Sequence, residues 1–471
     1  MSHTEPARQH YTLTFAVLAL GGAAFALLQS LVAPALPTIQ HDLHTSATSA
    51  TWVLTAYLLS AAVFTPIIGR LGDMHGKERM LVGVLGVLAA GTLIAALAHS
   101  IGLMILGRAV QGAGGAVFPL AFGIIRDEFP RERVATGIAL VSAILGVGGG
   151  LGIVLAGPIV EHLSYHWLFW MPLVVVVAAA GLTHFFVPES PIKTPGQVNW
   201  AGAGLLSAWL VCLLLGISEG PSWGWGSLRI VALLVATAVF AVLWVRNEQR
   251  AAEPLVDMRM MRRRAVWTVN ATAVLLGAGM FSSFVLIPQF VQLPVSSGFG
   301  FGASVTGAGL FLVPSTIGML LVSPLAGRLS STVGSRVPLL VGALASTAAF
   351  ALLATAHEHR SEVYVASGLM GIGIGFAFSA MANLMVEAVR PDETGVATGM
   401  NTVMRTIGGS VGAQVGASVL TASVVHGLPT ERGFTLAFAI AAAALFVSFV
   451  SALAVPRPAR AGNSLAHAAA A

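Results

Sequence analysis

Residues 69–81 read Gly-Arg-Leu-Gly-Asp-Met-His-Gly-Lys-Glu-Arg-Met-Leu and bring together five charged side chains and three glycines. The runs before and after this stretch, 50–68 and 80–98, are apolar and long enough to cross a bilayer as helices. Because lipid does not solvate charged groups, we expect the stretch to lie in water as a tight turn between two membrane helices. Asp73 would then lie at a helix terminus, where its carboxylate can accept hydrogen bonds from backbone N–H groups or pair with an arginine.

The composition is typical of a helical membrane protein. Of 471 residues 56% are hydrophobic and 9% are charged, whereas soluble domains carry about 25% charged residues. The formal net charge of +5 could serve nucleic-acid binding or membrane topology, and the placement of the lysines and arginines has to separate these two roles. One cysteine, Cys212, allows neither an intrachain disulfide nor a cysteine metal cluster, so we expect no metal site.

Apolar runs of about 20 residues, separated by charged or Gly- and Pro-rich breaks, predict fourteen membrane spans. The expected spans are 12–36, 50–69, 80–98, 101–125, 134–160, 166–187, 200–218, 227–245, 265–290, 303–326, 337–356, 362–389, 394–425 and 432–455.

The distribution of positive charge supports this count. With the N-terminus inside, nineteen of the 24 lysines and arginines fall on the cytoplasmic side, and only Arg229, Arg360 and Arg432 fall outside. The other two, Arg108 and Arg405, lie within spans. Nucleic-acid binding would need these charges on one soluble face. We therefore expect cytoplasmic termini, a location in the plasma membrane (the inner membrane of a bacterial cell) and no nucleic-acid partner.

A repeat divides the chain into halves. Residues 327–336 (Gly-Arg-Leu-Ser-Ser-Thr-Val-Gly-Ser-Arg) copy the stretch from Gly69 at an offset of 258, with Ser331 and Ser335 where Asp73 and Lys77 stand. Such repeats imply a substrate site at their interface near the bilayer midplane. The expected parts are an N-terminal six-helix bundle in 1–190, an inserted helix pair in 191–250, a basic cytoplasmic linker in 251–264, a C-terminal six-helix bundle in 265–456 and a disordered tail in 457–471.

The pattern Gly-x-Leu-Gly-Asp-x-x-Gly-Lys-x-Arg in the first copy resembles the signature loop between helices 2 and 3 of the major facilitator superfamily of secondary transporters. Six plus two plus six spans resemble the fourteen-span drug:proton antiporter family within it. The resemblance covers nearly the whole chain and implies an all-α polytopic membrane protein with the major facilitator fold. It also implies a loop that controls conformational change, formed by Gly69, Asp73, Gly76, Lys77 and Arg79.

Two arginines lie within spans, where a charge is costly and should face protein or a water-filled cavity. Arg108 and Gln111 share a helix face and are similar to the family's Arg-x-x-Gln-Gly-x-Gly motif. A coupling role beside the cavity competes here with a structural tie to backbone carbonyls. Arg405 lies about 16 Å along its span, with Asn401 one turn before it, and helix packing is the alternative to a cavity role.

Small residues dominate 146–158, which lets another helix pack backbone to backbone or lets the span bend. The stretch is similar to the antiporter motif of exporters through Gly148, Gly152, Gly157 and Pro158, although Ile153 stands where the family's Gly-Pro pair has proline.

Other side chains could line an apolar cavity as a few polar or aromatic anchors, with lipid-facing or helix-packing roles as alternatives. These candidates are Gln29, Trp52, Tyr57, Phe281, Phe284 and Gln289. None of the 19 acidic residues falls near the middle of a span, and Leu28 stands where many relatives have an aspartate, so no buried carboxylate for proton coupling is evident.

We therefore expect a secondary transporter that exports amphipathic small molecules, such as drugs, by alternating access. We do not expect an enzyme. The transporter would use the proton gradient and no cofactor, and its partners would be the bilayer, the substrate and protons, with the chain acting as a monomer. Two span arginines without a nearby acid favour neutral, zwitterionic or anionic substrates. The alternatives are a lipid or fatty-acyl translocator of the same fold and a non-transporting membrane sensor.

Overall fold

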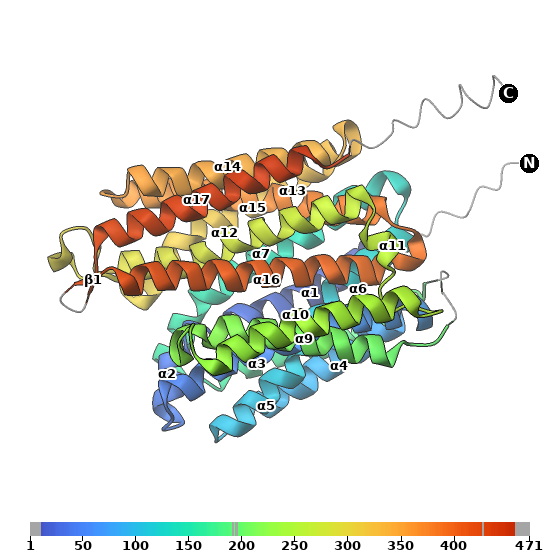
Figure 1. The fold of residues 1–471 in the computed structure, drawn as a ribbon, viewed down its shortest axis with the longest axis horizontal. Helices are drawn as coiled ribbons and strands as arrows, with labels where there is room; N and C mark the ends of the chain where they lie inside the picture. Colours follow the sequence, from blue (N-terminus) through green and yellow to red (C-terminus); the bar gives the residue numbers. More distant parts are fainter. Residues whose placement is uncertain (1–10, 191–192, 194–195, 426–427, 457–471) are drawn as a thin grey trace, which may run out of the picture.

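The computed structural model describes residues 11–190, 193, 196–425 and 428–456. In this part the regular secondary structure is helical apart from a short antiparallel hairpin of β1 (Val424–Val425) and β2 (Leu428–Pro429). Most of the long helices run side by side along one axis (Figure 1). This arrangement follows from the sequence, because apolar runs of 20 to 32 residues satisfy all their backbone groups only as helices when lipid surrounds them.

The first part of the chain holds the helices α1 (Tyr11–Ser30), α2 (Leu36–Asp42), α3 (Ala47–His75), α4 (Lys77–Ala96), α5 (Ile101–Gln111), η1 (Gly112–Ala116), α6 (Val117–Glu128), α7 (Arg131–His162) and α8 (Trp167–Phe186). Helices α5, η1 and α6 form one span, in which the 3₁₀ segment coincides with a Gly-Ala-Gly-Gly-Ala run.

The second part holds α9 (Trp200–Trp223), α10 (Leu228–Arg250), α11 (Met258–Met261), α12 (Arg264–Gln292), η2 (Val295–Ser297), α13 (Val305–Val333), α14 (Arg336–Thr355), α15 (Arg360–Ala388), η3 (Pro391–Glu393), α16 (Thr394–Ala422) and α17 (Glu431–Leu453).

Thirteen helices within the described residues are long and apolar enough to cross a membrane, and each overlaps one expected span. The expected span 394–425 is the exception. Helix α16 covers it with 29 residues, but Asn401, Arg405 and Gln414, together with its glycines and threonines, make it too polar to qualify by composition. The chain is thus an integral membrane protein with about thirteen candidate spans, and the fourteenth span stays a prediction.

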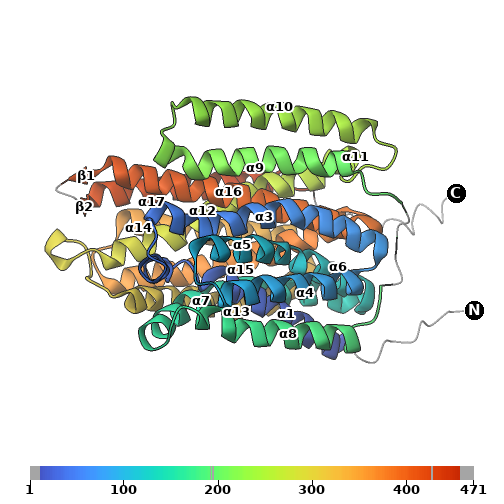
Figure 2. The ribbon, with the colours of Figure 1, turned by 90° about the horizontal axis from the view of Figure 1, so that it is seen from below.

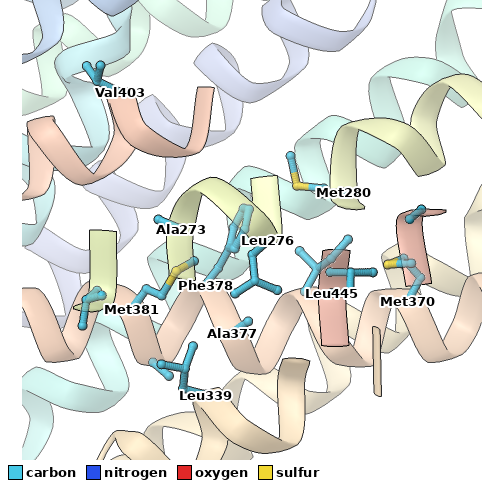
Figure 3. Packing of buried hydrophobic residues seen from close by; sticks show 14 of the residues in the cluster. Ala273, Leu276, Met280, Leu339, Met370, Ala377, Phe378, Met381, Val403 and Leu445 are labelled. Atoms are coloured by element: carbon cyan, nitrogen blue, oxygen red, sulfur yellow. The ribbon is translucent and has the colours of Figure 1, made fainter. Parts of the chain in front are cut away.

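The buried apolar side chains form two clusters, which follow the two halves of the chain. One cluster draws on α1 to α8 and adds Ala382 and Val386 of α15. The other draws on α9 to α17 and adds Ile67 of α3. Figure 3 shows part of the second cluster, where Phe378 of α15 packs against Leu276 of α12. Each half therefore has its own core, and a few side chains of each enter the core of the other.

Helices α9 and α10 lie on one side of the molecule. In Figure 2 α10 is the outermost helix, and α9 lies between it and the rest of the chain. Helix α9 packs on α3 and α16, whereas α10 packs mainly on α9 and leaves large apolar side chains such as Leu228 and Val235 exposed. Trp209 and Trp244 join the two helices with ring centroids 5.9 Å apart.

Polar contacts between distant segments define the two ends of the helix bundle. At one end, here called the basic end, they join the turns that follow α3, α6, α13 and α15 to neighbouring termini, as between Lys77 and Asp127 or Arg263 and Glu393. At the opposite end Glu161 meets Thr306 and His357 meets Glu431. The three arginines that the sequence places outside begin α10, α15 and α17 at this opposite end.

Candidate functional site

The turn between α3 and α4 is shorter and more buried than the sequence indicates. Helix α3 continues through the charged stretch to His75, and Gly76, with a φ of +113°, is the only residue between it and α4. The expectation that the whole stretch lies in water is wrong, because Asp73 and Lys77 are fully buried and only Arg79 among the charged residues is exposed. Burial is possible because these charges find partners within the protein.

Lys77 is held by acidic side chains. Its Nζ lies 2.7 Å from Oδ2 of Asp127 at the end of α6 and 3.8 Å from Oδ1 of Asp73. Arg79, in contrast, reaches out to Glu189 after α8, with 3.1 Å between Nε and Oε2. The basic turn is therefore tied to the ends of α6 and α8 within the first half.

Asp73 connects the first half to the second. Its two carboxylate oxygens accept hydrogen bonds of 3.1 Å from the backbone N–H groups of Gly395 and Val396 in the first turn of α16. Carboxylates are stabilised at helix N-termini because the N–H groups there lack partners and the helix dipole is positive. The expected contact with backbone N–H groups is present, and the helix it serves belongs to the other half.

Close backbone contacts accompany this link. A Cβ on Gly69 would lie 2.5 Å from the carbonyl oxygen of Gly395, so α3 and α16 touch without a side chain between them. The second copy of the repeat shows the same kind of contact, since a Cβ on Gly327 would lie 2.7 Å from Cα of Thr136 in α7. Glycine is required at Gly69 because any larger residue would separate the two helices.

Arg126 makes a second link across the halves. Its guanidinium donates hydrogen bonds to the carbonyl oxygens of Val389 (2.9 Å) and Arg390 (3.1 Å) and to Oγ1 of Thr394 (2.7 Å). Arg126 thus binds carbonyls where α15 ends, while Asp73 binds N–H groups where α16 begins. This role was not predictable from the sequence, where Arg126 resembles the other arginines expected on the cytoplasmic side.

The second copy of the loop is less connected. Ser331, the counterpart of Asp73, is exposed, and among the described residues its hydroxyl donates only to the carbonyl oxygen of Arg328 in its own helix. Ser335, the counterpart of Lys77, is buried and donates to Glu387 of α15 at 2.8 Å. Each copy of the loop thus makes a polar contact within its own half, through Lys77 in the first and Ser335 in the second. Of the two counterparts Asp73 and Ser331, Asp73 alone is a carboxylate that binds the other half.

A small cavity lies between the halves. It has a volume of about 20 Å³, room for about one water molecule. Its lining comes from α6, α7, α15 and α16, namely Phe118, Phe122, Ser142, Leu145, Phe378, Ala382, Thr398, Asn401, Thr402 and Arg405. Of the sequence candidates, Arg405 and Asn401 therefore reach the interface.

Arg108 and Gln111 lie away from this cavity, inside the first half. The guanidinium of Arg108 is fully buried and donates to the carbonyl oxygens of Leu28 (3.1 Å) and Val53 (3.2 Å) and to Oε1 of Gln111 (2.7 Å). It also stacks over the ring of Tyr57, 4.2 Å from the centroid. These contacts are the tie to backbone carbonyls that the sequence left open, and a coupling role for Arg108 stays a prediction.

The glycine-rich part of α7 packs against a helix on each of two faces. A Cβ on Gly148 would lie 2.5 Å from Cβ of Ala26 in α1, and Ser30 of α1 also donates to the carbonyl oxygen of Gly148. Gly152 likewise faces Ser30, whereas Gly157 faces Thr306 of α13 in the other half, at 2.5 Å. Helix α7 continues through Pro158 to its end at His162.

The remaining cavity candidates lie in separate places. Phe281 and Phe284 pack against each other on α12 with centroids 6.3 Å apart, and Gln29 and Trp52 are partly buried in the first half. Gln289 lines a wider groove of about 380 Å³ at the opposite end, beside β2. The interface cavity instead uses Ser142, Phe118 and Phe378, which in sequence are indistinguishable from packing residues.

Comparison with known proteins agrees with the fold. A family model described as Major Facilitator Superfamily matches residues 18–413 and 297–470. Multidrug resistance protein 3 of Bacillus subtilis (strain 168) is 30% identical over 388 residues, 81% of this chain and 74% of that protein. The tetracenomycin C resistance and export protein of Streptomyces glaucescens is 30% identical over 391 residues, 82% of this chain and 71% of that protein.

A solved structure shares the fold. The human organic anion transporter MFSD10 (TETRAN) superposes with a TM-score of 0.68 over 95% of this chain and 100% of that one, at 15% sequence identity. Together with the family model and the two relatives, this fold shows that the chain is a membrane transporter that belongs to the Major Facilitator Superfamily.

Proposed function

We propose that the protein exports amphipathic small molecules, drugs or antibiotics among them, by alternating access between its two halves. The observation that carries the proposal is the link at the basic end, where Asp73 of the first half binds the first turn of α16 in the second. A charge that holds two separately packed halves together is suited to a gate that opens and closes. The names of the relatives, multidrug resistance and resistance-and-export proteins, favour efflux over the lipid or fatty-acyl translocator.

The proposal includes fourteen spans, with α16 as the one that composition alone misses. A 29-residue helix packed beside the 29-residue α12 and against α3 is long enough to span the bilayer with them. With α9 and α10 as an inserted pair, the chain falls into six, two and six spans. The basic end would face the cytoplasm, since lysines and arginines collect on that side of a plasma membrane.

In the proposed cycle the loop of Gly69, Asp73, Gly76, Lys77 and Arg79 sets the gate, and the substrate binds between the halves near Asn401 and Arg405. The described lining of the cavity contains no carboxylate, which favours neutral, zwitterionic or anionic substrates over cationic ones. A monomer suffices, because both halves of the site come from one chain.

Transport in vesicles with an imposed pH gradient tests the proposal. The purified protein would be reconstituted, and uptake of a panel of neutral dyes and antibiotics measured with the gradient present, absent and collapsed by an uncoupler. Proton antiport predicts accumulation that needs the gradient and stops with the uncoupler. Flux that ignores the gradient would remove the antiport mechanism, and absence of flux for the whole panel would remove drug export.

A further inference from the structure

Arg405 carries a positive charge into the interface cavity without a counterpart in the protein. Within the described residues no hydrogen bond or ion pair reaches its guanidinium, and no charged side chain lies close enough to influence it. The guanidinium of Arg108, in contrast, has two carbonyl oxygens and an amide oxygen as acceptors. An arginine inside a membrane protein is retained at a cost that a bound anion would offset.

A second unused donor faces the same cavity from the other half. Ser142 of α7 is 3% exposed, and its Oγ has no hydrogen-bond partner in the described structure. The hydroxyls of Thr398 and Thr402, also in the lining, donate to carbonyl oxygens of α16 itself. Since buried hydroxyl groups are normally paired, the free hydroxyl of Ser142 points to a missing acceptor.

Aromatic rings surround these two donors. The guanidinium carbon of Arg405 lies 4.5 Å from the ring centroid of Phe378, while Phe118 and Phe122 line the cavity from α6. Stacking on one face leaves the N–H groups at the edge of a guanidinium free to bind a carboxylate or sulfonate with two hydrogen bonds. Apolar walls with a few convergent polar groups are typical of sites for amphipathic ligands.

We infer that Arg405 and Ser142 form an anion-binding site, which takes the carboxylate or sulfonate of an aromatic amphiphile between the halves. The inference rests on the proposed function and names its substrate class. Because the two donors belong to different halves, the bound anion would connect α7 and α16. A cavity of about 20 Å³ holds no such ligand, so the bound state has the halves farther apart at this level.

A pair of probes with the same ring and opposite charge tests this site. Naphthalene-2-sulfonate and 2-naphthyltrimethylammonium would be titrated by equilibrium dialysis against the full chain in phosphatidylcholine nanodiscs. We expect the wild type to bind the sulfonate at least about tenfold more tightly than the ammonium ion. Arg405→Gln should remove this preference, and Ser142→Ala should weaken the sulfonate alone by about fivefold.

Control variants separate the site from general effects. Arg131→Gln removes an exposed arginine at the start of α7 and should leave both affinities unchanged. If Arg405→Gln fails to fold, Arg405→Lys replaces it, because lysine keeps the positive charge. A preference for the sulfonate that survives in Arg405→Lys confirms that the preference is electrostatic. The sulfonate titration is repeated in nanodiscs that also contain phosphatidylglycerol. Weaker sulfonate binding in these discs shows that a lipid phosphate competes for the anion site, whereas unchanged binding shows that the site takes the soluble amphiphile and not the lipid.

Equal or tighter binding of the ammonium ion by the wild type would overturn the inference, as would a sulfonate preference that Arg405→Gln and Ser142→Ala both leave intact. Uptake of a neutral dye driven by the pH gradient is measured on the same variants. If neutral export persists in the wild type without any charge preference, the anion site is refuted while the proposed function stands.

Discussion

The Asp73 carboxylate and the backbone N–H of Gly395 lie 3.1 Å apart although 322 residues separate them in the chain. Asp73 also accepts a hydrogen bond from the N–H group of Val396. One side chain of the first half therefore satisfies two N–H groups in the first turn of a helix of the second half. Four predictions concern this gate and the topology around it.

Asp73→Asn should reduce transport by more than about tenfold while substrate binding stays nearly intact. The amide keeps the size of the side chain but loses the charge that faces the α16 N-terminus, which weakens gate closure by ~2 kcal/mol. Uptake and binding measured on the same preparation check this. Ser331→Ala, the exposed counterpart in the second copy, should behave as wild type, and lost affinity with normal turnover in Asp73→Asn would contradict the assignment.

Arg126→Gln should open the basic end. The variant loses charge-assisted hydrogen bonds to Val389, Arg390 and Thr394, which together fix the turn between α15 and α16. Spin labels at His75→Cys and Thr332→Cys, in a Cys212→Ser background, should report a longer distance across the two halves than in the parent. Unchanged distances would show that Asp73 closes this end without Arg126.

Gly69→Ala should block closure through steric contact. The added methyl group would lie 2.5 Å from the carbonyl oxygen of Gly395, so α3 and α16 must separate. Thr398→Cys, protected from a thiol reagent in the closed protein because it is 3% exposed, should become reactive in the variant. Gly83→Ala is the matched control, because nothing lies within 4 Å of its added Cβ.

Single cysteines at exposed sites should reveal the topology. With Cys212 replaced by serine, cysteines at His75, Gln197 and Glu253 should react only from the cytoplasm, and those at Ser222 and Gly298 only from outside. Labelling of intact cells with a membrane-impermeant maleimide, before and after permeabilisation, distinguishes the two groups. Two reversed sites would be incompatible with the proposed orientation.

The positions of thirteen helices were predictable from the sequence, because the length and hydropathy of each segment and the charges beside it determine whether that segment prefers lipid or water. These properties can be read for each segment without knowing its neighbours in the fold. Burial of Asp73 and Lys77 was not predictable in the same way. Their charges look suited to water, and the groups that compensate them, Asp127 and the first turn of α16, are brought close only by tertiary packing.

The candidate site was predictable in part for a related reason. Arg405 stood out because a charge within a span is rare, whereas Ser142 and Phe378 have the composition of ordinary packing residues. Arg126 could not be singled out, because two of its three partners are backbone carbonyls, which every sequence contains.

The polar character of α16 has a consequence for how the protein is made. As the proposed fourteenth span, α16 would be too polar to partition into lipid by itself, and it would enter the bilayer with the helices it packs along, α12 and α3. Helix α3 is synthesised more than 300 residues before α16, so the contact between the two helices can form only late in translation. A fragment that lacks α3 should therefore leave α16 poorly inserted and open to degradation by membrane proteases.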